Sequence, residues 1–219
     1  MLPLNFFKNS RGCCKVLCLG AHSDDIEIGC GGSVLQLLAH HRNLEFHWVV
    51  FSSGRERERE ARRSADLFLK GAAKKNVVVH DFRNGYFPSV LDDIKDYFEE
   101  LKAEISPDVI FTHTRHDLHQ DHRVLSELAW NTWRNHVILE YEIPKYDGDL
   151  GTPNLYIPFD RRIGTRKVKY LMDCFGTQRD KHWFTPDTFQ GLMRIRGIEA
   201  NSKGMLAEGF YARKVVLGE

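Results

Sequence analysis

Residues 15–32 read KVLCLGAHSDDIEIGCGG, and both the fold and the chemistry of the chain are predicted from this stretch. The apolar run at residues 16–19 predicts a buried strand. Polar side chains follow at His22, Asp24 and Asp25, and a glycine cluster then opens an apolar pattern typical of a helix. A strand that ends in a turn with carboxylates and an imidazole, followed by the start of a helix, indicates a candidate reaction centre.

Strand and helix patterns alternate along the chain as far as Pro144. The predicted strands are residues 15–19, 46–51, 76–80, 109–112 and 137–143, and the predicted helices are residues 33–41, 55–69, 91–104 and 123–134. This alternation predicts an α/β protein, a Rossmann-like three-layer sandwich in which a mostly parallel sheet carries helices on both faces. Beyond Pro144 the pattern is weaker, and it favours a short strand at 156–158, helices at 166–175 and 188–196, and a last strand at 208–217.

The 219-residue chain has the composition of a globular protein, with 42% hydrophobic and 28% charged residues. It is long enough to bury one sizeable core, so we expect a single domain over residues 1–219. Its net charge of +1 gives no electrostatic case for nucleic acid or a membrane surface, and no apolar run approaches the roughly 18 residues of a membrane helix. We therefore expect no nucleic-acid partner and no membrane span, whereas a homo-oligomer is compatible with the composition.

The five cysteines are odd in number, and most of them lie in or near the first predicted strand. They predict reduced, buried residues rather than a disulfide framework. The first residues, MLPLNFFKNSRGCC, lack the apolar core and the small-residue cleavage site of a signal peptide. Together these features favour a cytoplasmic protein.

A second polar segment, FTHTRHDLHQDHR at residues 111–123, begins in the predicted strand at 109–112 and continues beyond its end. In doubly wound sheets ligands bind beyond the carboxyl ends of the strands, at the point where the strand order reverses. In the common strand order that point lies between the first and the fourth strand. The two polar segments are therefore expected to share one crevice.

The side chains of both segments are of the types that hold a catalytic zinc ion, which takes three protein ligands and leaves one position for water. His22 and Asp25 can supply two ligands. Histidines recur at every third residue of the second segment, so they cannot all face one ion, and the third ligand would be one of His113, His116, His119 and His122. Fe2+ is the alternative metal. Two other interpretations stay open, namely solvated polar turns and a non-catalytic Rossmann-like nucleotide-binding module.

RERERE at residues 55–60 is the most conspicuous charge run in the chain. Opposite charges three and four positions apart favour a solvated helix face. The alternative is that Arg55 or Arg57 contacts a substrate phosphate. Four further candidates for binding a sugar or a phosphate flank the predicted crevice: Arg115, Arg123, Tyr141 and Glu142. For Tyr141 and Arg123 the alternative is a packing or surface position.

The two polar segments resemble the motifs of the PIG-L/LmbE-like zinc de-N-acetylases. AHSDDIEIGCGG resembles the family's A-H-P-D-D-E motif, and HQDH at residues 119–122 resembles its H-P-D-H motif. YEIPKYDGDLGTPN and the tail of the chain are similar to the bacterial branch that acts on amino sugars. Ser23 stands where the family usually has proline, and Ile26 where it often has an acid, so that Glu27 is displaced by one position.

The resemblance implies roles for six residues and an overall reaction. It implies His22, Asp25 and His122 as zinc ligands, Asp24 as general base, a protonated His119 as stabiliser of the oxyanion, and Asp121 as the residue that orients an imidazole. The implied reaction removes the acetyl group from an N-acetylated amino sugar, such as a nucleotide-linked or glycan-precursor N-acetylhexosamine, and releases acetate and a free amine. A zinc amidohydrolase that acts on a non-sugar amide is the alternative.

Overall fold

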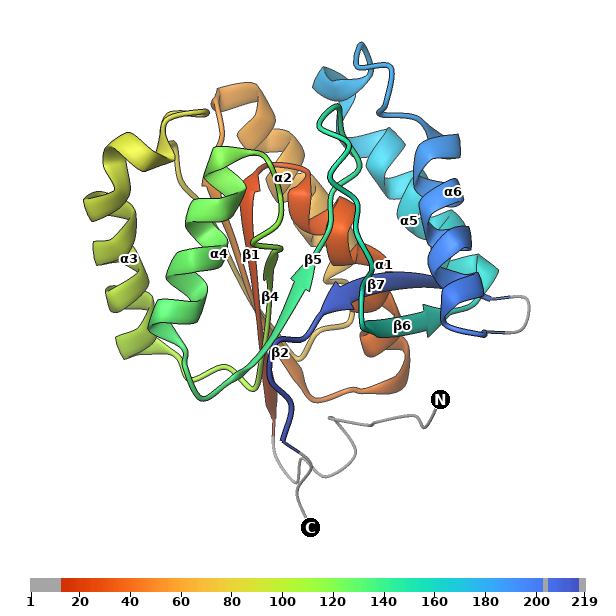
Figure 1. Cartoon of the computed structure of the whole chain (residues 1–219), viewed down its shortest axis with the longest axis horizontal. Helices are drawn as coiled ribbons and strands as arrows, with labels where there is room; N and C mark the ends of the chain where they lie inside the picture. Colours follow the sequence, from red (N-terminus) through yellow and green to blue (C-terminus); the bar gives the residue numbers. More distant parts are fainter. Residues whose placement is uncertain (1–12, 203–204, 217–219) are drawn as a thin grey trace.

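The computed structural model of the chain describes residues 13–202 and 205–216. These residues form a seven-stranded sheet in the order β3-β2-β1-β4-β5-β7-β6 (Figure 1). The strands are β1 (Cys14–His22), β2 (Leu44–Ser52), β3 (Lys74–Val79), β4 (Val109–His113), β5 (Val137–Tyr141), β6 (Leu155–Phe159) and β7 (Leu206–Tyr211). β1 to β5 pair in parallel, and β7 is antiparallel to both of its neighbours. The predicted mostly parallel sheet is confirmed.

Helices cover both faces of the sheet, so the predicted three-layer sandwich is also confirmed (Figure 1). One face carries α1 (Asp25–His40), α2 (Arg55–Phe68), α5 (Arg161–Cys174) and α6 (Pro186–Glu199), and the other carries α3 (Leu91–Glu104) and α4 (Gln120–Thr132). Two short 3-10 helices, η1 (Phe87–Val90) and η2 (Gly176–Gln178), lie in the connections. Alternate residues of β1 point to opposite faces, with Val16 and Cys18 in one apolar core and Leu17 and Leu19 in the other.

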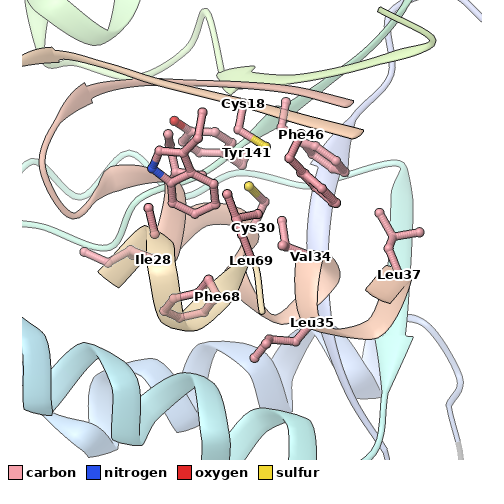
Figure 2. Packing of buried hydrophobic residues seen from close by; sticks show 14 of the residues in the cluster. Cys18, Ile28, Cys30, Val34, Leu35, Leu37, Phe46, Phe68, Leu69 and Tyr141 are labelled. Atoms are coloured by element: carbon pink, nitrogen blue, oxygen red, sulfur yellow. The ribbon is translucent and has the colours of Figure 1, made fainter. Parts of the chain in front are cut away.

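Helix α1 begins at Asp25, eight residues before the predicted start at Ser33, and the glycine cluster lies inside it. These glycines are sites of close packing. A Cβ atom on Gly29 would lie 2.1 Å from the ring of Tyr141, and one on Gly31 would lie 2.6 Å from the ring of Phe68. In Figure 2, α1 passes beneath the sheet close to both rings. The helix can therefore approach the sheet closely only because these positions lack side chains.

The C-terminal part of the chain is joined to α1 by a buried ion pair. The backbone N–H groups of Gly32 and Ser33 donate to the Glu208 carboxylate at 2.8 and 2.7 Å. The Lys167 ammonium donates to the same carboxylate at 2.6 Å and to the carbonyl of Ile28 at 2.5 Å. Glu208 lies in β7, which covers only the first residues of the predicted strand at 208–217. Residues 212–216 are not in a strand, and residue 217 lies outside the described residues.

The cysteines of the structure are all free, and Cys14, Cys18, Cys30 and Cys174 are buried, as predicted, whereas Cys13 is exposed. Cys18 and Cys30 lie close together between the sheet and α1 (Figure 2). Within the described ranges, no helix combines the length and the apolar character needed to cross a bilayer.

Candidate metal centre

The fold brings the two polar segments together at one edge of the sheet. β1 and β4 are adjacent and parallel, with Val16 opposite Val109 and Cys18 opposite Phe111. From this pair the sheet continues to β2 on one side and to β5 on the other, so the strand order reverses between β1 and β4. The turn after β1 and the loop after β4 therefore meet at the carboxyl ends of the strands, which is where doubly wound proteins bind ligands.

Three donor atoms from these segments surround a common point. Nδ1 of His22 lies 3.1 Å from Nε2 of His122 and 3.2 Å from Oδ2 of Asp25, and Nε2 of His122 lies 3.4 Å from the same Oδ2. A tetrahedral zinc ion with bonds of about 2.0–2.2 Å places its ligand atoms roughly 3.3–3.5 Å apart. The three donors therefore fit a zinc ion of this geometry. All three residues are buried.

Each candidate histidine ligand is oriented by a carboxylate on its other ring nitrogen. Nδ1 of His122 lies 2.8 Å from Oδ2 of Asp117. Nε2 of His22 lies 3.3 Å from Oδ2 of Asp121, whose carboxylate also accepts the backbone N–H groups of Gly85 and Phe87 at 2.6 and 3.1 Å. Such carboxylate–histidine pairs fix the ring orientation and increase the basicity of a metal-bound imidazole.

These carboxylates shift the pKa of the groups they face. Burial lowers the pKa of His122, but Asp25 and Asp117 outweigh it and raise the value to about 9. Burial raises the pKa of Asp25, yet the imidazoles of His122, His113 and His22 hold it well below its usual range. Positive charge on the imidazoles and negative charge on the Asp25 carboxylate therefore stabilise each other.

His113, one of the four histidines considered for the third ligand, also lies in contact with Asp25. Its Nε2 accepts the backbone N–H of Ala21 at 3.0 Å and lies 3.2 Å from Oδ2 of Asp25. Burial, together with the nearby His122, lowers the pKa of His113 to about 4, so its ring is neutral. His116 is exposed and packs near Tyr211 instead. His122 closes the triangle with His22 and Asp25, and it belongs to both groups of three side chains that could hold a metal ion, His22, His119 and His122, and Asp25, His113 and His122.

His119 caps α4, which begins three residues before the predicted helix at 123–134. Its Nδ1 accepts the backbone N–H of Asp121 at 3.2 Å, so the proton of the neutral ring resides on Nε2. Burial and the two neighbouring imidazoles of His122 and His22 lower the pKa of His119. The lowered pKa favours a neutral imidazole that can donate one hydrogen bond through Nε2, while the role of a protonated His119 stays a prediction.

Asp24 lies next to the donor triangle without being part of it. Its Oδ1 accepts a hydrogen bond from Nη2 of Arg57 at 2.8 Å. Burial raises the pKa of Asp24, and Arg57 opposes this shift. Of the two arginines considered in the charge run, Arg57 therefore reaches the site, whereas Arg55 is exposed at the start of α2 and does not line the cavity.

The departures from the family motif have local consequences. The Ser23 hydroxyl donates to the Ser53 hydroxyl at 3.0 Å, so the turn that lacks proline is tied to the end of β2. Ile26 is fully buried and packs against Gly20. Burial raises the pKa of the displaced Glu27 well above its usual range. Neither of its carboxyl oxygens has a hydrogen-bond partner among the described residues, so Glu27 is not among the groups that orient the candidate ligands.

A cavity of about 590 Å³, including its open mouth, lies over the donor triangle. Residues of the two motifs line it together with residues from later segments: His22, Asp24, Asp25, Arg57, Asn84, His119, His122, Ile143, Lys145, Tyr146, Asp147, Lys181 and Trp183. No residue of these later segments was predicted to contribute, although residues 145–147 lie in the stretch YEIPKYDGDLGTPN that resembles the bacterial branch of the family. The alternation of aromatic and basic residues at KHW, residues 181–183, is the sequence feature that could have drawn attention to one of them.

The other candidates for substrate binding lie away from this cavity. The Tyr141 side chain is fully buried, and its hydroxyl donates to the carbonyl of Leu19 at 2.6 Å. Glu142 is buried in a two-pronged ion pair with Arg196, at 2.6 and 2.8 Å. Each of these polar groups is therefore already satisfied within the fold.

The two remaining arginines serve the loop after β4. The Arg123 guanidinium donates to the carbonyls of Asp117 and Leu118 at 3.1 and 2.5 Å, which stabilises the loop that leads into α4. Arg115 is exposed, and its side chain contacts His116. Neither side chain lines the cavity.

Comparisons with known proteins agree with this arrangement. The family model described as PIG-L, GlcNAc-PI de-N-acetylase, matches residues 17–133. Among proteins with curated descriptions, none matches the sequence significantly.

Three solved structures illustrate the likeness of fold. An N,N'-diacetylchitobiose deacetylase from Pyrococcus horikoshii has 19% identity and a TM-score of 0.67, over 94% of this chain and 86% of that one. The 4-carboxy-2-hydroxymuconate hydratase GalB from Pseudomonas putida KT2440 has 16% identity and a TM-score of 0.71, over 94% and 98%. The A40926 pseudoaglycone deacetylase Dbv21 has 17% identity and a TM-score of 0.64, over 92% and 98%. The family match covers more than half of the chain and contains both polar segments, so the chain belongs to the PIG-L family.

Proposed function

We propose that the protein is a metal-dependent deacetylase that hydrolyses the acetamido group of an N-acetylated amino sugar to acetate and a free amine. The observation that carries this proposal is the triangle formed by His22, Asp25 and His122, with donor separations of 3.1–3.4 Å. The carboxylate of Asp24 lies beside it and is held by Arg57 rather than by the triangle. Membership of the PIG-L family supports the same reaction.

In this proposal His22, Asp25 and His122 hold one divalent cation. Two imidazoles and one carboxylate suit Zn2+, and Fe2+ is the alternative for the same donor set. A cation bound there polarises the amide carbonyl and lowers the pKa of a water molecule. Asp117 and Asp121 keep the two imidazoles in their ligating orientation.

Asp24 and His119 would carry the proton transfers. Asp24 removes a proton from the attacking water and returns it to the departing amine, and Arg57 keeps its carboxylate in position. His119 donates its Nε2–H to the oxyanion that develops from the acetyl carbonyl. A hydrogen bond of this kind, placed in advance, typically contributes about 3 kcal/mol to the stability of the transition state. We infer that Asp24 and His119 both line the cavity because both take part in the reaction.

The fold alone does not determine the reaction. One of the structural neighbours is named as a hydratase and others as deacetylases. Acetate release therefore separates the proposal from a different reaction at the same centre. A panel of N-acetyl sugars and non-sugar amides distinguishes a sugar deacetylase from a general amidohydrolase, and thermal stabilisation by nucleotides without any metal requirement would instead indicate a nucleotide-binding module.

The test uses protein from which metal has been removed and to which Zn2+ or Fe2+ is returned. Asp24→Asn is expected to retain the metal and to lose acetate release by at least about 100-fold, because the base is gone while the triangle remains. His122→Ala is expected to lose both. Asp147→Asn, at an exposed position of the cavity wall, is the matched control and keeps both. Undiminished acetate release by Asp24→Asn would remove the basis of the assignment.

A further inference from the structure

Three cations line the cavity, and two of them are neutralised by carboxylates. Arg57 pairs with Asp24 at 2.8 Å. Lys145 pairs with Asp117 at 3.0 Å and with Asp149 at 2.5 Å. Lys181 differs, because within residues 13–202 and 205–216 no carboxylate oxygen forms an ion pair with its ammonium group. A half-buried ammonium group that forms no direct ion pair is free to pair with an anionic group of a ligand.

The backbone around Lys181 is held in place, so its side chain projects from an ordered turn. The N–H of Lys181 donates to the carbonyl of Gln178 at 3.0 Å, and its carbonyl accepts the N–H of Phe184 at 2.9 Å. Phe184 and the neighbouring Phe175 are buried in the apolar core. Lys181 is thus a fixed part of the cavity wall.

Two aromatic rings lie beside this cation. The Lys181 ammonium is 5.4 Å from the centre of the Trp183 ring. The rings of Trp183 and Tyr146 are 6.3 Å apart and nearly perpendicular, and both residues line the cavity. Tyr146 is 64% exposed, so this part of the wall is open to a ligand. Aromatic faces supply apolar surface to the C–H groups of a sugar ring, and the adjacent cation selects the charge of its substituent.

We propose that Lys181, Trp183 and Tyr146 form a subsite that binds an anionic group, phosphate or carboxylate, attached to the acetylated sugar. The sugar lies against the aromatic rings, and the anion pairs with the Lys181 ammonium. This inference rests on the proposed deacetylase function and names the class of its substrate. The reaction residues belong to the segment matched by the family model, residues 17–133, whereas the subsite lies wholly outside it. Recognition of the anion would therefore fall to residues outside the matched segment.

A second role for Lys181 would be to act on Asp24. Its charge contributes to lowering the pKa of Asp24, although less than the charge of Arg57, which is hydrogen-bonded to that carboxylate. The two roles have different consequences. A lysine that binds the substrate anion affects only anionic substrates and acts mainly on KM. A lysine that acts on Asp24 affects every substrate equally and shifts the pH profile of kcat.

The test compares three N-acetylglucosaminides with the zinc-loaded protein: the neutral methyl glycoside, the 1-phosphate and the carboxymethyl glycoside. Wild type is expected to prefer at least one anionic substrate over the neutral one by about 10-fold or more in kcat/KM, the value of one charged hydrogen bond. The better of the two anions identifies whether phosphate or carboxylate is the natural group. Lys181→Met is expected to abolish this preference by raising KM for the anionic substrates far more than for the neutral one, whereas Lys181→Arg retains the preference.

Two controls separate this inference from the proposed function. Lys169→Met removes an exposed lysine of α5 that pairs with Asp173 and is expected to behave as wild type. The same sugars are also titrated against Asp24→Asn, so that binding is measured whether or not acetate is released. Absence of acetate from every sugar would refute the deacetylase function alone. Equal binding of anionic and neutral sugars, or an equal loss on both in Lys181→Met, would overturn the anionic subsite.

Discussion

Replacing Gly29 by alanine tests whether the close contact between α1 and the sheet is required. The Cβ of alanine would lie 2.1 Å from Cδ2 of Tyr141, whereas ordinary contact begins at 3.4 Å, so the ring or the helix must move by about 1.3 Å. Tyr141 has little freedom to move, because its side chain is fully buried and its hydroxyl donates to the carbonyl of Leu19 at 2.6 Å. The same hydroxyl lies 3.3 Å from Nε2 of His113, which contacts Asp25.

The expected cost follows from two opposing terms. Overpacking of a tight core costs about 1–3 kcal/mol, and the anchored ring places Gly29→Ala at the upper end of that range. Alanine is favoured over glycine inside a helix by about 1 kcal/mol, which offsets part of the strain. We therefore expect Gly29→Ala to lower the free energy of unfolding by about 2 kcal/mol. Zinc affinity should fall with it, because the shift of Tyr141 reaches Asp25 through His113.

Gly191 offers a matched control inside α6. A Cβ atom there would meet nothing within 4 Å, so Gly191→Ala gains the helix preference without strain. It should raise the free energy of unfolding by up to about 1 kcal/mol. Urea unfolding monitored by circular dichroism measures both variants, and the expected difference between them is about 3 kcal/mol. If the two glycine variants proved equally stable, the close packing of α1 against Tyr141 could not be correct.

Two further predictions concern carboxylates that the sequence did not single out. Asp117→Asn should weaken zinc binding by about 10–100-fold, because His122 loses its carboxylate partner. Competition with a chelator measures the zinc affinity. An unchanged affinity would exclude an orienting role for Asp117. Lys167→Met should cost about 3 kcal/mol by leaving Glu208 buried without its cation, whereas Lys169→Met at an exposed pair should cost at most about 1 kcal/mol. Thermal unfolding measures both lysine variants, and an equal fall in their midpoints would contradict the expected difference in stability.

The parallel sheet could be predicted because its central strands carry their signal locally. β1 and β2 are almost wholly buried on both faces, and each contains a continuous apolar run, residues 16–19 and 48–51. The helices between them then require parallel neighbours. From that topology the meeting of His22 with His122, a hundred residues apart, could be expected before any coordinates. The meeting depends only on strand order.

The start of α1 could not be predicted, because glycine inside a helix is locally unfavourable. The compensating term is the approach of Tyr141, Phe68 and Phe159 to the positions where side chains would otherwise stand. Those residues come from three other elements. Local sequence therefore predicted a helix that begins after the glycine cluster, whereas tertiary packing favours a helix that includes it.

The substrate candidates illustrate a competition for charge that sequence does not reveal. Glu142 was a reasonable ligand for a sugar hydroxyl, but Arg196, 54 positions later, takes both of its oxygens. Arg57 reaches Asp24 whereas Arg55 does not, because the two lie on different sides of the first turn of α2. Which charged group remains unpaired depends on every partner within reach, so it follows from the packed structure alone.

Ligands of a metal ion and residues that recognise a substrate place different demands on the chain. Donors must converge within a few ångströms, and a short turn ensures this for two of the three: the backbone N–H of His22 donates to Oδ2 of Asp25 at 2.7 Å and fixes their separation. A substrate that is longer than the reacting bond must be contacted from several directions. The wall of the cavity accordingly includes the loops after β5 and η2, where Tyr146 and Lys181 have no fixed spacing to the two motifs. Sequence patterns can therefore indicate the chemistry of such a centre while leaving its specificity to the tertiary structure.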